Sequence, residues 1–395
     1  MSDASTDAGS QGRAMWHDAG WRAVVAAFML NGLLFGVWAS RVPAFKDHFA
    51  LEAGTLGLLL FALAGGAIAS FPLAGALVER WGADRMTVCC ACLSCPPLIG
   101  IALAPDILSL GMLLFVFGAL QGAMDVAMNG WGAQVENRLG RATMSIYHAM
   151  FSLGAGLGAA SGFIAIRLGL VPLVHFTIMA VIGGAIALYF MLAVRSLRKM
   201  AVAGKGGHEG VFRLPSGALF FAGIIGFAIS VGEGAMTDWS AVYLRSAIHV
   251  SEAQAALGYA AFSVAMVLTR LCGTVFVQRL GSISTMRLSG LTAFVGLVVV
   301  VLADRLALAL LGFALIGVGY AVVMPLVFSR AANDPVIRPG PAIASVATLT
   351  YGGLLLGPPL VGFVAQLTDL RVSFAILALL ALFAALMAPT LRISR

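Results

Sequence analysis

Four ionisable side chains lie well inside long apolar stretches of the sequence, namely Asp125, Glu233, Asp238 and Arg270. A charged side chain at the centre of a membrane helix costs roughly 2.5 to 3.5 kcal/mol on insertion scales. Groups that persist at this cost bind solutes or ions, exchange protons or pair with one another, and they face away from lipid. We therefore expect all four side chains to lie in the interior of a helix bundle.

Asp125 belongs to a polar stripe. Gln121, Asp125 and Asn129 are spaced by four residues, which places them on one face of an α-helix. Such a stripe can line a water path, and a carboxylate there can take up a proton from one side and release it to the other as its hydration changes. The stripe therefore predicts proton coupling at Asp125. The alternative is a structural hydrogen bond from Asp125 to a neighbouring helix.

Glu233 and Asp238 share one apolar stretch, in which two glycines flank Glu233 and loosen the helix around it. This segment predicts a gate or a binding element, with Glu233 as the second proton-coupling group. Asp238 is assigned to the solute path, and the alternative is a helix-end residue in water. Arg270 either contacts an anionic or hydroxylated solute or pairs with an acid such as Asp125.

Aromatic and amide side chains extend the expected solute path. Trp38 and Trp239 can stack on a sugar ring, although an interfacial tryptophan belt explains them equally well. Asn31 completes a polar face of the first apolar run, and Tyr351 is assigned to the same path. His148 lies close to the start of a run, where we expect a surface histidine.

Motifs of common enzymes and phosphate sites are absent from the sequence: it contains no H-E-x-x-H, no G-x-S-x-G and no G-x-x-x-x-G-K-[ST] segment. Four of the five cysteines lie between positions 89 and 95, but no His, Asp or Glu accompanies them within that run. Helix packing therefore explains these cysteines better than a metal site does. We expect no catalytic residue, no cofactor and no metal.

Composition makes lipid the solvent of most side chains, because the chain is 61% hydrophobic and only 10% charged. Its apolar runs have the length of a membrane-spanning helix, about twenty residues, and lack the alternation of barrel strands. Backbone groups in lipid must be satisfied internally, as an α-helix does. The expected fold is all-α, with twelve transmembrane helices. Their predicted ranges are 21–40, 55–78, 86–104, 107–130, 142–168, 171–194, 214–240, 253–276, 287–303, 306–328, 341–366 and 370–389.

The net charge of +7 comes from basic residues between the apolar runs, so nucleic acid is not an expected partner. Of the 24 Lys and Arg residues, seventeen fall on one side of the predicted membrane and six on the other, while Arg270 lies inside a helix. Lys and Arg are retained on the cytoplasmic side of short loops. We therefore expect a multi-pass inner-membrane protein with both termini in the cytoplasm.

The chain also divides into two similar halves. We expect a disordered cytoplasmic tail at 1–20, a six-helix bundle at 21–194, a polar linker at 195–213 and a second six-helix bundle at 214–395. The segment that ends in Gly82 matches the one that ends in Gly281 at an offset of 199. Two parallel repeats imply a pseudo-two-fold axis along the membrane normal, with a solute site near mid-membrane between them.

The loop after the second run carries a family motif. The segment Gly75–Arg85 reads GALVERWGADR and is similar to the G-x-x-x-[DE]-R-x-G-x-x-[RK] loop of the major facilitator superfamily, which the chain resembles over essentially its whole length. The resemblance implies a monomeric secondary transporter that works by alternating access in the lipid bilayer. It also implies a gate at the cytoplasmic surface, formed by the residues of the motif. These residues are Gly75, Glu79, Arg80, Gly82 and Arg85.

Further segments resemble one branch of that superfamily. The runs 124–129, 135–136 and 148–154 are similar to the bacterial MosC-like and fucose-permease-like branch. This resemblance implies a small solute of the sugar, polyol or amino-sugar type, moved by symport with protons. The alternative is a proton-coupled exporter of drugs or metabolites. The fourth predicted helix has no Arg and the fifth has no Gly-Pro pair, which are usual in the drug antiporters of the superfamily.

Overall fold

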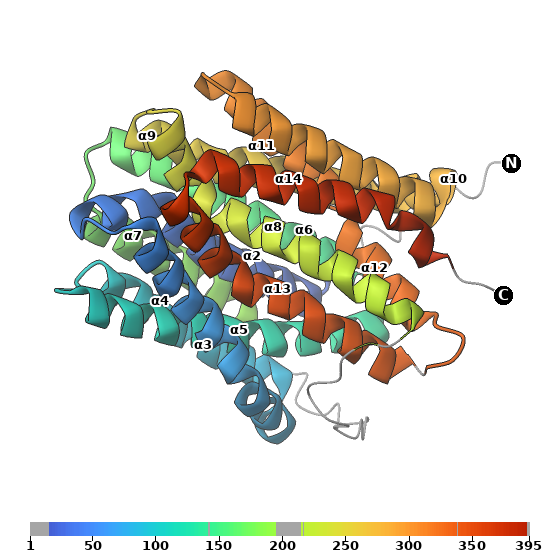
Figure 1. Cartoon of the computed structure of the whole chain (residues 1–395). Helices are drawn as coiled ribbons and strands as arrows, with labels where there is room; N and C mark the ends of the chain where they lie inside the picture. Colours follow the sequence, from blue (N-terminus) through green and yellow to red (C-terminus); the bar gives the residue numbers. More distant parts are fainter. Residues whose placement is uncertain (1–15, 141–142, 195–214, 216, 338, 393–395) are drawn as a thin grey trace, which may run out of the picture.

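The computed structural model describes residues 16–140, 143–194, 215, 217–337 and 339–392, and these residues form helices and short connections without a strand (Figure 1). The long helices run alongside one another through the length of the molecule. The first half comprises α2 (Ala19–His48), α3 (Ala53–Trp81), α4 (Ala83–Ile101), α5 (Ile107–Leu139), α6 (Met144–Arg167) and α7 (Pro172–Leu192).

The second half begins after the linker. It comprises α8 (Ala218–Ala247), α9 (Glu252–Ala255), α10 (Leu257–Leu302), α11 (Leu306–Tyr320), α12 (Val323–Ala332), α13 (Pro339–Leu367) and α14 (Leu370–Leu386), with a short 3-10 helix, η1, at Ala388–Leu391. Helix α10 contains two spans that meet at Gly281, where the backbone leaves the helical conformation. Helices α11 and α12 together form one span.

Twelve membrane-spanning elements result, as the sequence predicts. Ten spans among the described residues are long and apolar enough to cross a membrane. Helix α4 and the shorter apolar α14 complete the set. Large apolar side chains such as Leu108, Leu268 and Leu379 are exposed on the outer surface, where lipid solvates them, and the helical backbone satisfies its own hydrogen bonds.

The two halves repeat a turn in backbone detail. Gly82 lies between α3 and α4 with φ 93° and ψ 148°, and Gly281 lies between the two spans of α10 with φ 76° and ψ 162°. Only glycine adopts this region at little cost, because a Cβ would clash with the backbone. The matching turns agree with the repeat found in the sequence. The bounds of the halves stay a prediction.

The halves meet chiefly along the pairs α3 with α13, α6 with α10, and α2 with α8, and α9 also contacts α6. Small residues allow the approach of α3 and α13. A Cβ built on Gly57 would lie 3.1 Å from the carbonyl oxygen of Pro358, which is closer than ordinary van der Waals contact. The interface between the halves is therefore tightly packed at this level.

The predicted helix bounds are too short at several ends. Helix α2 continues to His48 instead of ending at 40, and α5 continues to Leu139. Residues 16–20 are folded and not part of a disordered tail, because Asp18 accepts a hydrogen bond from the backbone of Trp21 at 2.8 Å and caps α2. Residues 1–15 and 195–214 lie outside the described residues.

Candidate solute site

The bundle has two ends. The linker end is where α3 joins α4, α5 joins α6 and α8 begins, and the far end is where α2 and α8 finish. A cavity of about 510 Å³ lies at the linker end between the halves. Its wall comes from the start of α6, including His148, from α10, including Arg270 and Gln278, and from α12, including Pro325.

Arg270 connects three helical segments at this cavity. Its Nη1 donates to Ser152 Oγ of α6 at 2.7 Å, and its Nε donates to the carbonyl oxygen of Ala321 at 3.3 Å. Its Nη2 lies 3.4 Å from Glu233 Oε1 of α8 and forms an ion pair with it. The planar guanidinium, with five donors in fixed directions, suits such a junction. Arg270 therefore links its own half to Ser152 of the other half.

Arg270 pairs with an acid, as one of the two sequence-based alternatives has it, but the acid is Glu233 and not the example Asp125. Helices α8 and α10 belong to the same half and pack directly on each other. The side chains of Arg270 and Glu233 are only 13% and 29% exposed, so their charges are partly dehydrated. Loss of the charge on either group would leave the other in a poorly solvated place.

Asp125 is partly buried on α5. Its Oδ1 accepts a hydrogen bond from Asn129 Nδ2 at 3.1 Å, within its own helix, so the alternative of a structural bond to a neighbouring helix finds no support in this contact. The Tyr351 side chain interacts electrostatically with Asp125 across the halves and packs edge-on against Phe71. Asp125 and Tyr351 are thus brought together from α5 and α13.

Asn31 and Gln121 form a buried link between α2 and α5. Gln121 Nε2 donates to the Asn31 carbonyl oxygen at 2.9 Å, and Asn31 Nδ2 donates to the Gln121 carbonyl oxygen at 3.2 Å. Both side chains are almost fully buried, and Gln121 Oε1 has no partner in the described part of the chain. This pair holds the first half together beside the path, and one acceptor remains available.

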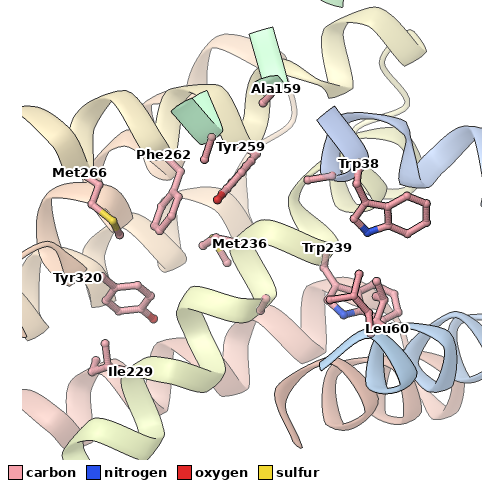
Figure 2. Packing of buried hydrophobic residues seen from close by; sticks show 14 of the residues in the cluster. Trp38, Leu60, Ala159, Ile229, Met236, Trp239, Tyr259, Phe262, Met266 and Tyr320 are labelled. Carbon is pink, nitrogen blue, oxygen red and sulfur yellow. The ribbon is translucent and has the colours of Figure 1, made fainter. Parts of the chain in front are cut away.

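The two tryptophans of the predicted path are enclosed. Trp38 and Trp239 are buried on α2 and α8, and Figure 2 shows both indole rings in the core cluster that also contains Leu60. An interfacial belt is therefore the wrong explanation, because belt residues lie at the water boundary. Asp238 is only 7% exposed, so it is not a helix-end residue in water either. The two Nε1 atoms and Asp238 Oδ1 lack hydrogen-bond partners among the described residues.

Three polar pairs join the halves at the far end, and none was predicted. Arg41 Nη1 lies 3.2 Å from Glu252 Oε1, and Arg245 Nη2 lies 3.6 Å from Asp47 Oδ2. In the third pair, Gln366 Nε2 donates at 2.9 Å to Oε2 of Glu52, the N-cap residue of α3. We call these three contacts the far-end pairs. The sequence signal that could have found two of them is the presence of opposite charges near the far ends of helices in the two halves.

Arg41 is the most buried member of the far-end pairs, with a side chain that is 3% exposed. Its Nη2 donates to the carbonyl oxygen of Leu170 at 2.6 Å, and its Nε donates to His175 Nδ1 at 3.3 Å. The other ring nitrogen of His175 lies 2.9 Å from Ser161 Oγ. Arg41 thus binds α2 to α7, to α9 and to the connection between α6 and α7.

Two further predictions concern the motif loop and metals. Gly82 makes the turn between α3 and α4, and Arg80 and Arg85 are exposed beside it. The role of Gly75, Glu79 and the two arginines as a gate stays a prediction.

No group of three His, Cys, Asp or Glu side chains is arranged to hold a metal within the part of the chain that the structure describes.

Comparison of sequences gives relatives along nearly the whole chain. An uncharacterized transporter of Sinorhizobium fredii, y4wD, is 45% identical over 94% of this chain and 98% of its own length. An uncharacterized MFS-type transporter of Yersinia pestis is 36% identical over 90% of this chain and 91% of its own length. The membrane protein MosC of Rhizobium meliloti is 29% identical over 88% of this chain and 84% of its own length.

Comparison with solved structures shows a shared fold. The crystal structure of a mutant of the nucleoside transporter NupG matches with a TM-score of 0.74 at 15% identity, over 95% of this chain and all of that one. A bacterial homolog of the human lysosomal transporter Spinster matches with a TM-score of 0.69 at 15% identity, over 93% of this chain and 95% of that one. The family model of the Major Facilitator Superfamily matches residues 20–336. This chain is therefore a member of the major facilitator superfamily of transporters.

Proposed function

We propose that this transporter carries a small polar solute of the sugar, polyol or amino-sugar type by symport with protons. The observation that carries the proposal is the junction at Arg270, which pairs with Glu233, donates to Ser152 of the other half and lines the cavity. The Arg270 guanidinium thus contacts the protonatable Glu233 and the other half of the protein, and it lines the cavity in which a solute would bind.

The cavity suits a hydroxylated solute. His148, Arg270 and Gln278 offer hydrogen-bond donors and acceptors, and apolar side chains such as Pro325 and Phe328 form the rest of the wall. A binding site of this size with a few convergent polar groups is typical of small-molecule recognition. A sugar or polyol presents both hydroxyl groups and apolar ring or chain faces, and so matches both kinds of wall.

Protonation of Glu233 would couple the proton gradient to transport of the solute. A proton on this carboxylate removes its charge, so the attraction to Arg270 falls and the guanidinium becomes free to bind hydroxyl groups or to leave Ser152. Asp125, on the other side of the interface, is the second proposed proton carrier. Its partner Asn129 can bond to either protonation state, because an amide both donates and accepts.

Alternating access would follow from two sets of contacts between the halves. In the present state the far-end pairs are formed and the cavity lies at the linker end. The positive-inside pattern of Lys and Arg supports a cytoplasmic linker end, so this state would face the cytoplasm. We further propose that the protein is a monomer in the inner membrane with both termini cytoplasmic.

A proton-coupled exporter of drugs or metabolites is the second candidate, because it would use the same fold. The two functions differ in the sign of coupling: symport accumulates solute on the side to which protons flow, and antiport does the opposite. The solute panel should include nucleosides, since NupG is a nucleoside transporter with this fold.

Proteoliposomes with an imposed pH gradient test the proposal. We expect accumulation of a sugar, polyol or amino sugar when the outside is acidic. Asp125→Asn and Glu233→Gln should abolish gradient-driven accumulation but leave solute exchange intact, and Asp304→Asn, at an exposed loop acid, is the matched control. Unchanged accumulation in the Glu233→Gln and Asp125→Asn proteins would contradict proton coupling, and accumulation only with an acidic interior would favour the exporter.

A further inference from the structure

An apolar groove of about 370 Å³ lies on the outer surface of the first half, between α2, α6 and α7. Its walls include Val25, Met29, Leu157, Ile186 and Phe190, and every wall residue except one has an apolar or glycine side chain or is a tryptophan. Leu157 is 49% exposed and Ile186 is 57% exposed, so the groove opens toward the bilayer. It is separate from the cavity between the halves.

The exception is Arg22, which lies at the linker end of the groove, in the first turn of α2. Its side chain has no ion pair or hydrogen bond within the described residues. The nearest acid along the helix, Asp18, is already occupied, because its carboxylate pairs with Arg138 and also caps α2. The positive charge of Arg22 is therefore left for a ligand.

Two tryptophans stand at the same end of the groove. The rings of Trp16 and Trp21 pack edge-to-face with centroids 4.5 Å apart, and both residues line the groove. Trp16 is 60% exposed, and exposed tryptophan prefers the depth of the lipid headgroups, which indicates that Arg22 lies at that depth too. Trp21 is 1% exposed, and its Nε1 has no hydrogen-bond partner in the described chain, so a donor that needs an acceptor lines the site.

From these features we infer that the groove binds one anionic phospholipid, with an acyl chain along the apolar walls and the phosphate on Arg22. Water does not stably fill an apolar groove inside the hydrocarbon layer, whereas each methylene placed there makes favourable contacts. A phosphodiester matches the forked donors of a guanidinium, and basic pockets beside membrane helices are known to favour anionic headgroups. The fold and family membership alone do not require this site, which is independent of the transported solute.

Native mass spectrometry of the full-length protein in detergent tests the inference. The probes are phosphatidylglycerol and phosphatidylcholine with the same acyl chains, each titrated into the delipidated protein. We expect one phosphatidylglycerol to bind roughly tenfold more tightly than phosphatidylcholine, the preference typical of one charge-assisted contact. Arg22→Gln should remove that preference, whereas Arg287→Gln, at an exposed linker-end arginine of the second half, should preserve it.

A second variant separates the acyl chain from the headgroup. Leu157→Trp fills the groove and should lower the affinity for both lipids, and Leu291→Trp, at a comparably exposed position on α10, should lower neither. Thermal unfolding of each variant checks that the protein is folded. The inference is overturned if Arg22→Gln keeps the preference for phosphatidylglycerol, or if folded Leu157→Trp binds both lipids like the unchanged protein.

Discussion

At the scale of single residues, Arg270 decides how the site is organised. It serves as partner to a carboxylate, as donor to a hydroxyl of the other half and as part of the cavity wall. Its acidic partner is Glu233 and not Asp125, because sequence spacing says which faces two helices present but not which helices touch. Asp125 instead accepts a hydrogen bond from Asn129 on its own helix, so the two acids have different partners.

The Arg270–Glu233 pair gives a prediction about stability. Arg270→Gln leaves Glu233 as an uncompensated charge in a partly dry place, and we expect a loss somewhat below the roughly 3 kcal/mol typical of a fully buried pair. The double variant Glu233→Gln/Arg270→Gln should be more stable than Arg270→Gln alone. Thermal unfolding in detergent measures the coupling, and strictly additive losses would show that the two side chains do not interact.

At the scale of helices, the connections and end contacts decide what each element can do. The far-end pairs join α2 to α8 and α9, and α3 to α13. They differ in burial: Arg41 is 3% exposed, whereas Arg245 and Asp47 are 43% and 54% exposed. Exposed ion pairs contribute little to stability, because water screens their charges and long side chains lose conformational entropy when they are held in one geometry. Arg41 should therefore contribute most of the free energy that keeps the far end closed.

Labelling of a buried cysteine tests this difference. Ser240→Cys, at a fully buried position of α8, would be placed in a variant whose five native cysteines are replaced by alanine. We expect Arg41→Gln to increase its reaction rate with a water-soluble maleimide severalfold, and Arg245→Gln to change the rate much less. Equal rates in both variants would show that the buried pair has no special part in closure.

The cap of α5 gives a prediction about pH. The backbone N–H of Ser109 donates to Asp106 Oδ1 at 2.8 Å and the Ser109 hydroxyl donates at 2.9 Å. These two bonds hold the pKa of Asp106 below its usual range. Because the folded-state pKa is lowered, the stabilisation is present above the unfolded-state pKa, about 4, and is lost as the pH falls through the lower folded-state value.

We therefore expect Asp106→Ala to lower the melting temperature at neutral pH, and the difference from the unchanged protein to shrink below about pH 4. Asp106→Asn is the control, since asparagine caps a helix without titrating. Melting curves across this pH range make the comparison. A difference that stays constant, or grows in acid, would contradict a contribution from the ionised cap.

At the scale of the whole molecule, the two halves meet along an interface that the far-end pairs cross. A cavity of about 510 Å³ lies at the linker end, and a hollow of about 440 Å³ lies at the far end. Closure requires close approach of α3 and α13 at Gly57. The same closed end buries polar atoms without partners in the described chain, on Trp38, Asp238 and Trp239. Such atoms cost free energy, so we expect an open far end, in which water or solute reaches them, to recover part of this cost.

A bulky side chain at Gly57 tests whether the two halves move relative to each other during transport. Gly57→Trp cannot be accommodated beside Pro358, so we expect the far end to stay open, maleimide labelling of Ser240→Cys to rise, and transport to stop. Leu360→Trp, an exposed position on α13, is the matched control and should change neither. If Gly57→Trp labels like the control, closure at this level is not part of the transport cycle.

Much of the architecture could be predicted from the sequence alone. Twelve spans, their all-helical nature and the repeat followed from run lengths and from an offset of 199 between Gly82 and Gly281, because lipid leaves the backbone only a few ways to satisfy its hydrogen bonds. The sequence also singled out Asp125, Glu233 and Arg270, because charge in an apolar run is costly wherever the run folds.

Only the tertiary structure decided which of these groups meet. Ser152 and Arg270 are 118 positions apart, and Arg41 and Glu252 are 211 apart, so no local pattern links them. The burial of Trp38 and Trp239, the far-end pairs and the groove beside Arg22 likewise arise from helices that pack across the chain. Sequence periodicity specifies which residues share one face of a helix. Which residues of another helix they contact depends on the angle and the level at which the two helices pack, and long-range contacts set both.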